Sequence, residues 1–138
     1  MVLLIDANVI LDVLLKREEF IYDSSLVWKL CETKTVIGYV STLTFANLVY
    51  IMRKQLDHEQ ILKVFEIMEI IFKFADLTSL DLKCASSMNW NNFEDALQSC
   101  IAKDIKADYI ITRNVSDFNK SKVKAITPHD FLSLFQNN

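Results

Sequence analysis

The sequence VLLIDANVI, residues 2–10, joins a short apolar run to a helical pattern through a single aspartate. The run at Val2–Ile5 predicts a buried strand, and apolar residues at helical spacing from Val9 onward predict a helix directly after it. We expect Asn8 to cap this helix, because asparagine is a favoured N-cap residue. Asp6 then has no helix to cap, which favours a functional role for its carboxylate.

The alternation of strand and helix continues along the chain. Further strands are predicted at residues 36–40, 70–74, 109–112 and 123–126, with helical patterns between them. Residues 70–74 could instead extend the helix before them. This alternation is typical of α/β proteins, so we expect a three-layer α/β/α sandwich around a mostly parallel central sheet. The functional crevice of such a sheet lies beyond the carboxyl ends of its strands, and Asp6 falls there.

Short polar side chains mark the expected helix starts, because Ser, Thr, Asp and Asn cap helix N-termini. The expected starts are Ser24 or Ser25, Ser41-Thr42, a capping box at Asp57–Gln60, Ser79, Phe93, and Thr127-Pro128. The chain holds one glycine and one proline in 138 residues, which leaves no flexible linker. We therefore expect a single domain over residues 1–138.

The composition, with 51% hydrophobic and 24% charged residues, is that of a globular protein and excludes disorder. No apolar run approaches the length of a membrane span, and the first residues resemble neither a signal peptide nor a transit peptide. We expect a cytoplasmic protein with no membrane contact. The net charge of −3 argues against a protein that coats nucleic acid, but not against a nuclease with local basic clusters. Candidate clusters are Lys16-Arg17, Arg53-Lys54, and Lys120 with Lys122 and Lys124.

The cysteines, Cys31, Cys84 and Cys100, are odd in number and widely spaced, with no CxxC pair. Cys84 and Cys100 lie in apolar stripes of predicted helices. We expect buried, reduced thiols there rather than ligands or a disulfide framework.

Three acids stand at strand ends or helix starts that are far apart in the sequence. Asp6 follows the first strand, Asp95 lies at the start of the helix from Phe93, and Asp117 follows the strand at 109–112. Carboxylates gathered at a strand-end crevice repel one another and attract a hard cation such as Mg²⁺. We predict a metal-dependent enzyme. Two structural alternatives stay open: a helix-start charge for Asp95 and a turn residue for Asp117.

Five segments carry a more specific pattern through their order and spacing. They are LIDANV at 4–9, STLT at 41–44, FEDALQ at 93–98, ADYIITRN at 107–114 followed by DF at 117–118, and TPHDFL at 127–132. Together they resemble the PIN domain, the metal-dependent ribonuclease fold of VapC-type toxins, over essentially the whole chain. The resemblance implies an endoribonuclease that uses Mg²⁺ or Mn²⁺, a small antitoxin protein as partner, a homodimer, and RNA as substrate.

The resemblance also implies roles for individual residues. Asp6 and Asp95 match two of the family's metal-binding and catalytic acids, and Asp117 stands in for the acid that is usual at Asn114. These three carboxylates support one metal ion more readily than two. The supporting or substrate-binding positions are Asn8, Thr44, Asn47, Glu94, Thr112, Arg113 and Asn114. Glu94 is expected chiefly to stabilise the N-terminus of its helix. For Arg113, contact with RNA and pairing with a carboxylate are both open.

Amides stand at three positions where acids are usual in the family: Asn47, Asn92 and Asn114. An asparagine supplies a neutral oxygen, so this site should bind Mg²⁺ less tightly than a fully acidic one. The alternative is therefore a PIN-like binding module with weak or no catalysis. A phosphatase with an aspartate nucleophile and a receiver domain are disfavoured, because Asp6-Ala7-Asn8 lacks the second acid that both need.

Overall fold

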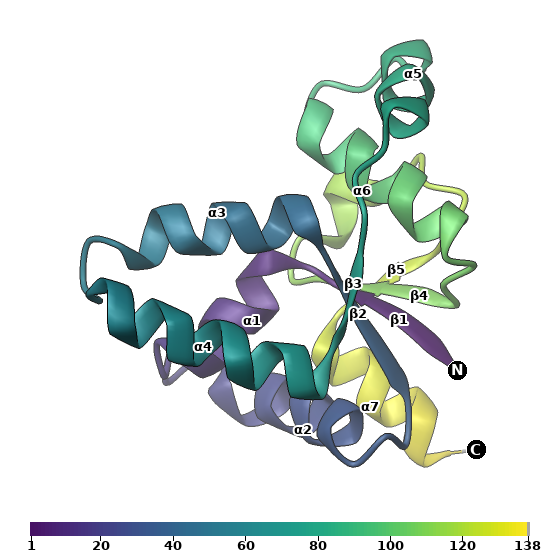
Figure 1. Ribbon diagram of the computed structural model, residues 1–138. Helices are drawn as coiled ribbons and strands as arrows, with labels where there is room; N and C mark the ends of the chain where they lie inside the picture. The colour runs from purple at the N-terminus through teal and green to yellow at the C-terminus, as the bar shows by residue number, and fades with distance from the viewer. Residues whose placement is uncertain (138) are drawn as a thin grey trace.

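The computed structural model describes residues 1–137 and shows strands alternating with helices (Figure 1). The elements in chain order are β1 (Val2–Ile5), α1 (Ala7–Leu14), α2 (Ile21–Glu32), β2 (Ile37–Ser41), α3 (Thr42–Met52), α4 (His58–Ile71), β3 (Lys73–Ala75), α5 (Ser79–Ser87), α6 (Phe93–Asp104), β4 (Tyr109–Ile111), the 3-10 helix η1 (Val115–Phe118), β5 (Ala125–Ile126) and α7 (Pro128–Gln136). Within residues 1–137 no helix is both long and apolar enough to cross a bilayer.

The central sheet has five strands in the order β3-β2-β1-β4-β5, and every neighbouring pair is parallel. Leu3 of β1 lies opposite Gly38 of β2 on one side and opposite Tyr109 of β4 on the other. The chain runs outward from β1 to β3 and then returns to β4, beside β1. The order of strands thus reverses between β1 and β4, which is where α/β sheets form their ligand crevice.

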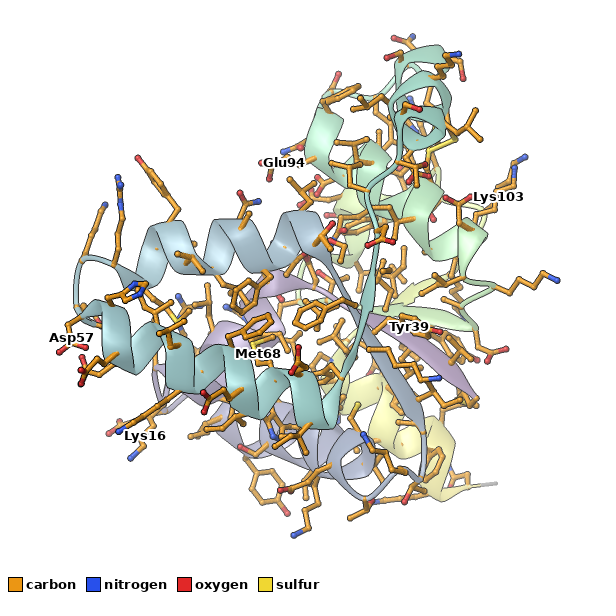
Figure 2. All side chains as sticks on the ribbon, viewed as in Figure 1. Lys16, Tyr39, Asp57, Met68, Glu94 and Lys103 are labelled. Carbon is orange, nitrogen blue, oxygen red and sulfur yellow. A yellow bond between two sulfur atoms is a disulfide. The ribbon has the colours of Figure 1, made fainter. Side chains whose placement is uncertain are left out.

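Successive residues of the central strands face opposite layers. Leu3 and Ile5 pack in the core that α1, α2, α3, α4 and α7 cover, and Met68 of α4 points into this core (Figure 2). Leu4 packs in the other core, with Ile101 of α6 and Phe118 of η1. In Figure 1, α5 and α6 lie on the face opposite α2, α4 and α7. The expected three-layer α/β/α sandwich is confirmed.

Three of the expected helix caps are confirmed. The side chains of Ser41, Asp57 and Thr127 each accept a hydrogen bond from the backbone N–H of the third helical residue. Asp57 forms the complete capping box with Gln60, whose side chain accepts from the Asp57 N–H at 2.9 Å. These caps determine the residues at which α3, α4 and α7 begin.

Two other expected starts are wrong. α2 begins at Ile21, so Ser24 lies inside the helix, where it is buried and donates a hydrogen bond to a carboxylate. Thr78, rather than Ser79, caps α5, because Thr78 forms a reciprocal capping box with Asp81. In both cases the expected cap residue lies within the helix, because the helix begins earlier in the sequence than predicted.

The expectation of reduced thiols at Cys84 and Cys100 is wrong, because these residues form a disulfide between α5 and α6. They are 16 residues apart in sequence, and the packing of α5 on α6 brings their Cα atoms to 6.3 Å, within the range of disulfides. Apolar spacing predicts which helix face is buried but not which faces meet. Cys31 is a buried free thiol, and burial raises its pKa to about 12.

Reduction of the Cys84–Cys100 disulfide is expected to lower the free energy of unfolding by about 3 kcal/mol, the value for a closed loop of this length. Urea unfolding with and without dithiothreitol measures the difference. A double variant, Cys84→Ser with Cys100→Ser, serves as control and should not respond to the reductant. Equal stability of the wild type in both conditions would contradict this expectation.

Candidate active site at the ends of β1 and β4

Asp6 is the first residue beyond β1 and lies at the point where the strand order reverses. Its N–H donates to the carbonyl of Ile111 at 2.9 Å, which extends the pairing of β1 with β4. Its Oδ1 accepts from the N–H of Ala7 at 2.9 Å, so Asp6 is the N-cap of α1. The expected cap at Asn8 is wrong, because the helix begins before the first apolar residue of its stripe. Capping uses only one of the two carboxylate oxygens.

The second oxygen of Asp6 is held by the residue that follows β4 and by α1. Oδ2 accepts from the hydroxyl of Thr112 at 2.8 Å and from the amide of Asn8 at 3.3 Å. Asn8 in turn accepts from the N–H of Arg113 at 3.3 Å, and the Thr112 hydroxyl accepts from the N–H of Asn114 at 3.0 Å. Asn8 and Thr112 therefore orient the Asp6 carboxylate, whereas Asn114 joins this network through its backbone.

Asp95 lies in the first turn of α6, which Asn92 caps by accepting from the Asp95 N–H at 3.2 Å. Partial burial raises the pKa of Asp95 to about 6, and the negative charges of Asp6, Asp117 and Glu94 add to the shift. Burial also raises the pKa of Asp6, to which the charge of Asp117 contributes. The three acids singled out in the sequence therefore lie near enough for their charges to act on one another.

Asp117 reaches this site from η1. Its N–H donates to the carbonyl of Asn114 at 3.0 Å and so makes the turn that follows β4. Its side chain lines a cavity of about 240 Å³ together with Asp95. The backbone of Asp117 thus has the structural role that was left open, and its carboxylate faces the site.

Gln98 belongs to the site and was missed in the sequence. It lies one turn of α6 beyond Asp95, is only 4% exposed, and donates through Nε2 to the Thr44 hydroxyl at 2.8 Å. The Gln98 side chain also lies close enough to Asp6 to lower the pKa of that acid, against the larger effect of burial. Its Oε1 has no hydrogen-bond partner among residues 1–137. Its spacing of three residues from Asp95 was the available signal, since such residues share a helix face.

Asn47 of α3 contacts the acid cluster through Glu94. Its Nδ2 donates to Oε1 of Glu94 at 3.4 Å, which links α3 to the start of α6. Figure 2 shows Glu94 on the side of α6 that faces α3. Glu94 lies in the first turn of α6, as expected, and the contact with Asn47 holds its charge beside Asp95.

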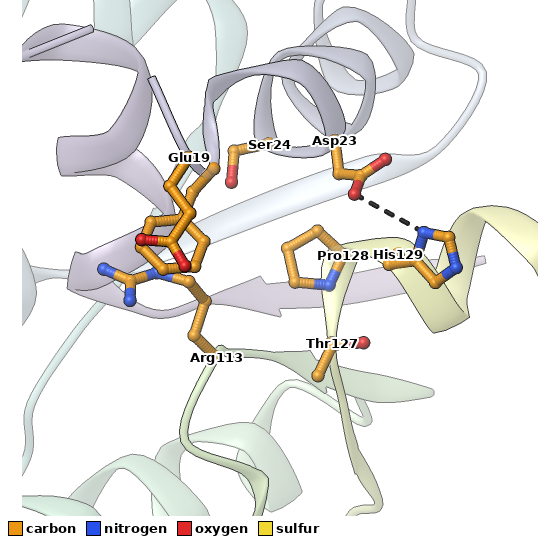
Figure 3. A pocket seen from close by; sticks show the side chains of 8 residues that line it. Glu19, Asp23, Ser24, Arg113, Thr127, Pro128 and His129 are labelled. Atoms are coloured by element: carbon orange, nitrogen blue, oxygen red, sulfur yellow. Dashed lines mark ion pairs between the residues drawn. The ribbon is translucent and has the colours of Figure 1, made fainter. Parts of the chain in front are cut away.

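Arg113 points away from the acids. Its Nε donates to Oδ2 of the fully buried Asp12 at 3.0 Å, and its guanidinium lies 3.8 Å from the centroid of the Phe20 ring. Figure 3 shows Arg113 in a separate pocket, beside Glu19. Of the two roles left open for Arg113, the structure shows pairing with a carboxylate.

The donors at the site fit a hard divalent cation in kind. Asp6, Asp95 and Asp117 present carboxylate oxygens, and the orphaned, buried Oε1 of Gln98 is a further neutral oxygen. Among residues 1–137, no three His, Cys, Asp or Glu side chains are gathered closely enough to ligate one ion. The carboxylates would have to move closer together to share one cation.

Asp95→Asn is expected to stabilise the metal-free protein at neutral pH by roughly 1 kcal/mol after allowance for solvent screening. The folded protein binds the Asp95 proton more tightly than the unfolded chain does, since the pKa is about 6 rather than 3.8. The contribution of the Asp95 carboxyl to the free energy of unfolding therefore falls as the pH rises from 3.8 to about 6. Above that range the protein carries the full destabilising effect of the ionised carboxylate.

Urea unfolding in EDTA, at neutral pH and below pH 3.8, measures this effect of Asp95. The gain from Asp95→Asn should disappear at the acidic pH, where both states of the wild type are protonated. Glu66→Gln, at an exposed position on α4, is the control and should change little. A variant that is less stable than the wild type at neutral pH would contradict the assignment of repulsion.

Comparison with known proteins gives the same fold. A family model described as a PIN domain matches residues 2–116. VapBC2 of Rickettsia felis, bound to a promoter DNA fragment, matches with a TM-score of 0.69 and 15% identity over 92% of this chain and 98% of that chain. A toxin–antitoxin complex from Klebsiella pneumoniae matches with a TM-score of 0.69 and 16% identity over 91% and 96%. FitAcB from Neisseria gonorrhoeae matches with a TM-score of 0.60 and 20% identity over 94% and 99%.

No relative was found among curated protein sequences. The structural matches described above have low sequence identity and therefore show the fold alone. The family model covers most of the chain and therefore shows the family. The chain belongs to the PIN-domain family.

Proposed function

We propose that this protein is a metal-dependent endoribonuclease and the toxin of a type II toxin–antitoxin pair. The observation that supports the proposal is that Asp6, Asp95 and Asp117, from three separate parts of the chain, lie near enough for their negative charges to repel one another, and that Asp6 directly follows β1, where the strand order reverses. Membership in the PIN-domain family, whose members are generally nucleases, supports hydrolysis of a nucleic acid.

In this proposal Asp6, Asp95 and Asp117 hold one Mg²⁺ or Mn²⁺ ion. Such an ion, when bound, stabilises the charge that develops on the scissile phosphate and lowers the pKa of an attacking water. The chain's own contribution is positioning: Thr112 and Asn8 fix the Asp6 carboxylate by hydrogen bonds of 2.8 and 3.3 Å. Asp95 must be ionised to bind the cation, so metal affinity should decline as pH falls below about 6.

The amides in and around the site lower its charge. Asn92 caps α6, and Asn47 donates a hydrogen bond to Glu94. Both are amides, so neither adds a negative charge to the site. Fewer charges imply weaker binding of Mg²⁺, for which carboxylates are the main protein ligands. We therefore expect Mn²⁺ to be more effective than Mg²⁺ in an assay, since first-row transition metals bind nitrogen and oxygen ligands more tightly than Mg²⁺ does.

We also propose a homodimer and an antitoxin partner. The solved structures with this fold include toxin–antitoxin complexes, which supports a partner of that kind. Exposed apolar side chains on α3 and α4 support association of two copies; they are Tyr50, Ile51, Leu62, Ile67 and Ile70.

Cleavage of RNA tests the proposed activity. Fluorescently labelled linear and circular RNAs of mixed sequence are incubated with purified protein in Mg²⁺, in Mn²⁺ or in EDTA. We expect both RNAs to be cut with either metal and neither to be cut in EDTA, because opening of a circle requires internal cleavage. If neither RNA is cut under any condition and the protein binds no Mn²⁺, the proposal is wrong and a non-catalytic binding module is favoured.

A further inference from the structure

A cavity of about 240 Å³ opens beside the acid site, between the loop before α6 and η1. Trp90 and Asn91 line it on the α6 side, Asn119 lines it on the η1 side, and Asp95 and Asp117 form the wall shared with the acid site. Sites for whole drug-sized ligands measure about 300–1,000 Å³. A cavity of this smaller size suits a single small ring system.

Trp90 gives the cavity an aromatic wall with a fixed orientation. Its ring contacts the buried ring of Phe118 edge-on, at 6.3 Å between centroids and 76° between planes. Trp90 also packs against the core that contains Leu4 and against a smaller cluster that contains Ala85 and Leu97, so its indole is half-buried and held in place. A flat ligand that stacks on it meets a side chain that is already ordered.

The amides of the cavity favour a neutral polar ring. Asp95 and Asp117 are the proposed metal ligands, so polar contacts to a ligand come from the rest of the lining, which includes Asn91 and Asn119. A ring that carries N–H donors and oxygen or nitrogen acceptors fits this lining, because the amides of Asn91 and Asn119 both donate and accept hydrogen bonds.

Lys120 places a positive charge on the cavity lining. Its Nζ donates to the backbone carbonyl of Asn89 at 3.0 Å, which holds the side chain across the loop before α6. A polyanionic backbone that runs past the cavity can contact this ammonium group while a neutral ring enters.

We propose that the cavity binds one unpaired nucleobase of the RNA, stacked on Trp90 and adjacent to the phosphodiester at the acid site. This inference rests on the proposed ribonuclease function and adds a base-binding subsite formed by Trp90, Asn91 and Asn119. Proteins that read single-stranded RNA commonly stack splayed-out bases on aromatic side chains and hydrogen-bond their edges. Asn91 and Asn119 are the residues that distinguish one base from another.

Equilibrium binding tests the base site without cleavage. A short, fluorescein-labelled, single-stranded RNA of random sequence is titrated with the Asp6→Asn protein, alone and combined with Trp90→Leu or Asn91→Ala. We expect Trp90→Leu to weaken binding by about tenfold, the usual loss for one stacked base, and Asn91→Ala to weaken it by a smaller factor. The matched controls are Trp28→Phe, at a ring that packs on Phe72, and Asn89→Ala, and neither should change the affinity.

Several outcomes overturn the proposal. The proposal is overturned if Trp90→Leu and Asn91→Ala both bind the single-stranded RNA as tightly as the parent protein. It is also overturned if the protein binds fully duplex RNA as tightly as single-stranded RNA. Loss of affinity for an antitoxin peptide but not for RNA would assign the cavity to a protein contact instead. If Trp90→Leu fails to fold, Trp90→Phe and Asn91→Ala still carry the test, because phenylalanine keeps a ring against Phe118 and Asn91 is exposed.

Tryptophan fluorescence gives an independent measurement. The chain has two tryptophans, so Trp28→Phe leaves Trp90 as the sole indole. Saturating RNA should quench or shift its emission, and an unchanged spectrum would overturn the stacking geometry. Failure of the base site leaves wild-type RNA cleavage intact, whereas failure of the ribonuclease proposal appears as no cleavage by the wild type.

Discussion

Asp6→Asn and Asp95→Asn are each expected to slow metal-dependent RNA cleavage by about 10²–10³-fold, more than the loss of a residue that only supports a ligand. Each substitution removes one full negative charge from a site where few charges are present, since amides stand at Asn47, Asn92 and Asn114. The fold should persist in both variants. Asparagine is as good an N-cap as the aspartate it replaces at position 6, and Asp95 is a source of repulsion.

Initial rates of RNA cleavage in Mn²⁺ measure this effect, with circular dichroism as the check on folding. Glu66→Gln, on α4, removes an equal charge away from the site and should leave the rate unchanged. Thr112→Val removes the 2.8 Å hydrogen bond to Asp6 and should give an intermediate loss, about 10–100-fold. Cleavage by Asp6→Asn and Asp95→Asn at the wild-type rate would exclude these acids from catalysis.

Asp12→Ala is expected to lower the free energy of unfolding by about 3–5 kcal/mol, the cost of breaking a buried ion pair. The Asp12 side chain is fully buried, with Arg113 at 3.0 Å and Arg17 at 3.5 Å. The hydroxyl of Ser24 donates to it at 3.0 Å. Removal leaves Arg113, whose side chain is 24% exposed, without its carboxylate, and leaves a buried hydroxyl without its acceptor. Such a loss is a large part of the stability of an ordinary domain.

Urea unfolding of Asp12→Ala and Asp12→Asn checks this prediction. The asparagine variant keeps an acceptor for Ser24 but loses the charge, so it should lie between the wild type and Asp12→Ala. Lys29→Ala, an exposed charge on α2, is the control. A loss below about 1 kcal/mol for Asp12→Ala, the value of a surface ion pair, would show that the Asp12 network contributes little.

The presence of the strands and their parallel direction were predictable because both follow from local patterns. Buried runs such as Val2–Ile5 and Tyr109–Ile111 read as strands separated by helices, and that alternation predicts a parallel sheet. Parallel strands bring their carboxyl ends to one edge, so Asp6 and the turn containing Asp117 could be placed together from the sequence. Asp95 could be placed with them through the resemblance to the PIN domain.

Contacts between distant helices were not predictable in the same way. Asp12 lies in the stripe of α1 and pairs with Arg113, 101 residues away, and no local pattern specifies that partner. The disulfide of Cys84 with Cys100 depends on which faces of α5 and α6 meet. Gln98 resembles an ordinary polar residue until its partners are known. Each of these depends on packing, which a single sequence does not reveal.

Binding of Mn²⁺ to the metal-free protein tests the central claim, that Asp6, Asp95 and Asp117 hold a divalent cation, most directly. Isothermal titration calorimetry at neutral pH would compare the wild type with Asp6→Asn, Asp95→Asn and the control Glu66→Gln. The account predicts one Mn²⁺ ion per chain in the wild type and in Glu66→Gln, and affinity at least about tenfold weaker in the two aspartate variants. No binding by the wild type, or equal binding by all four proteins, would contradict it.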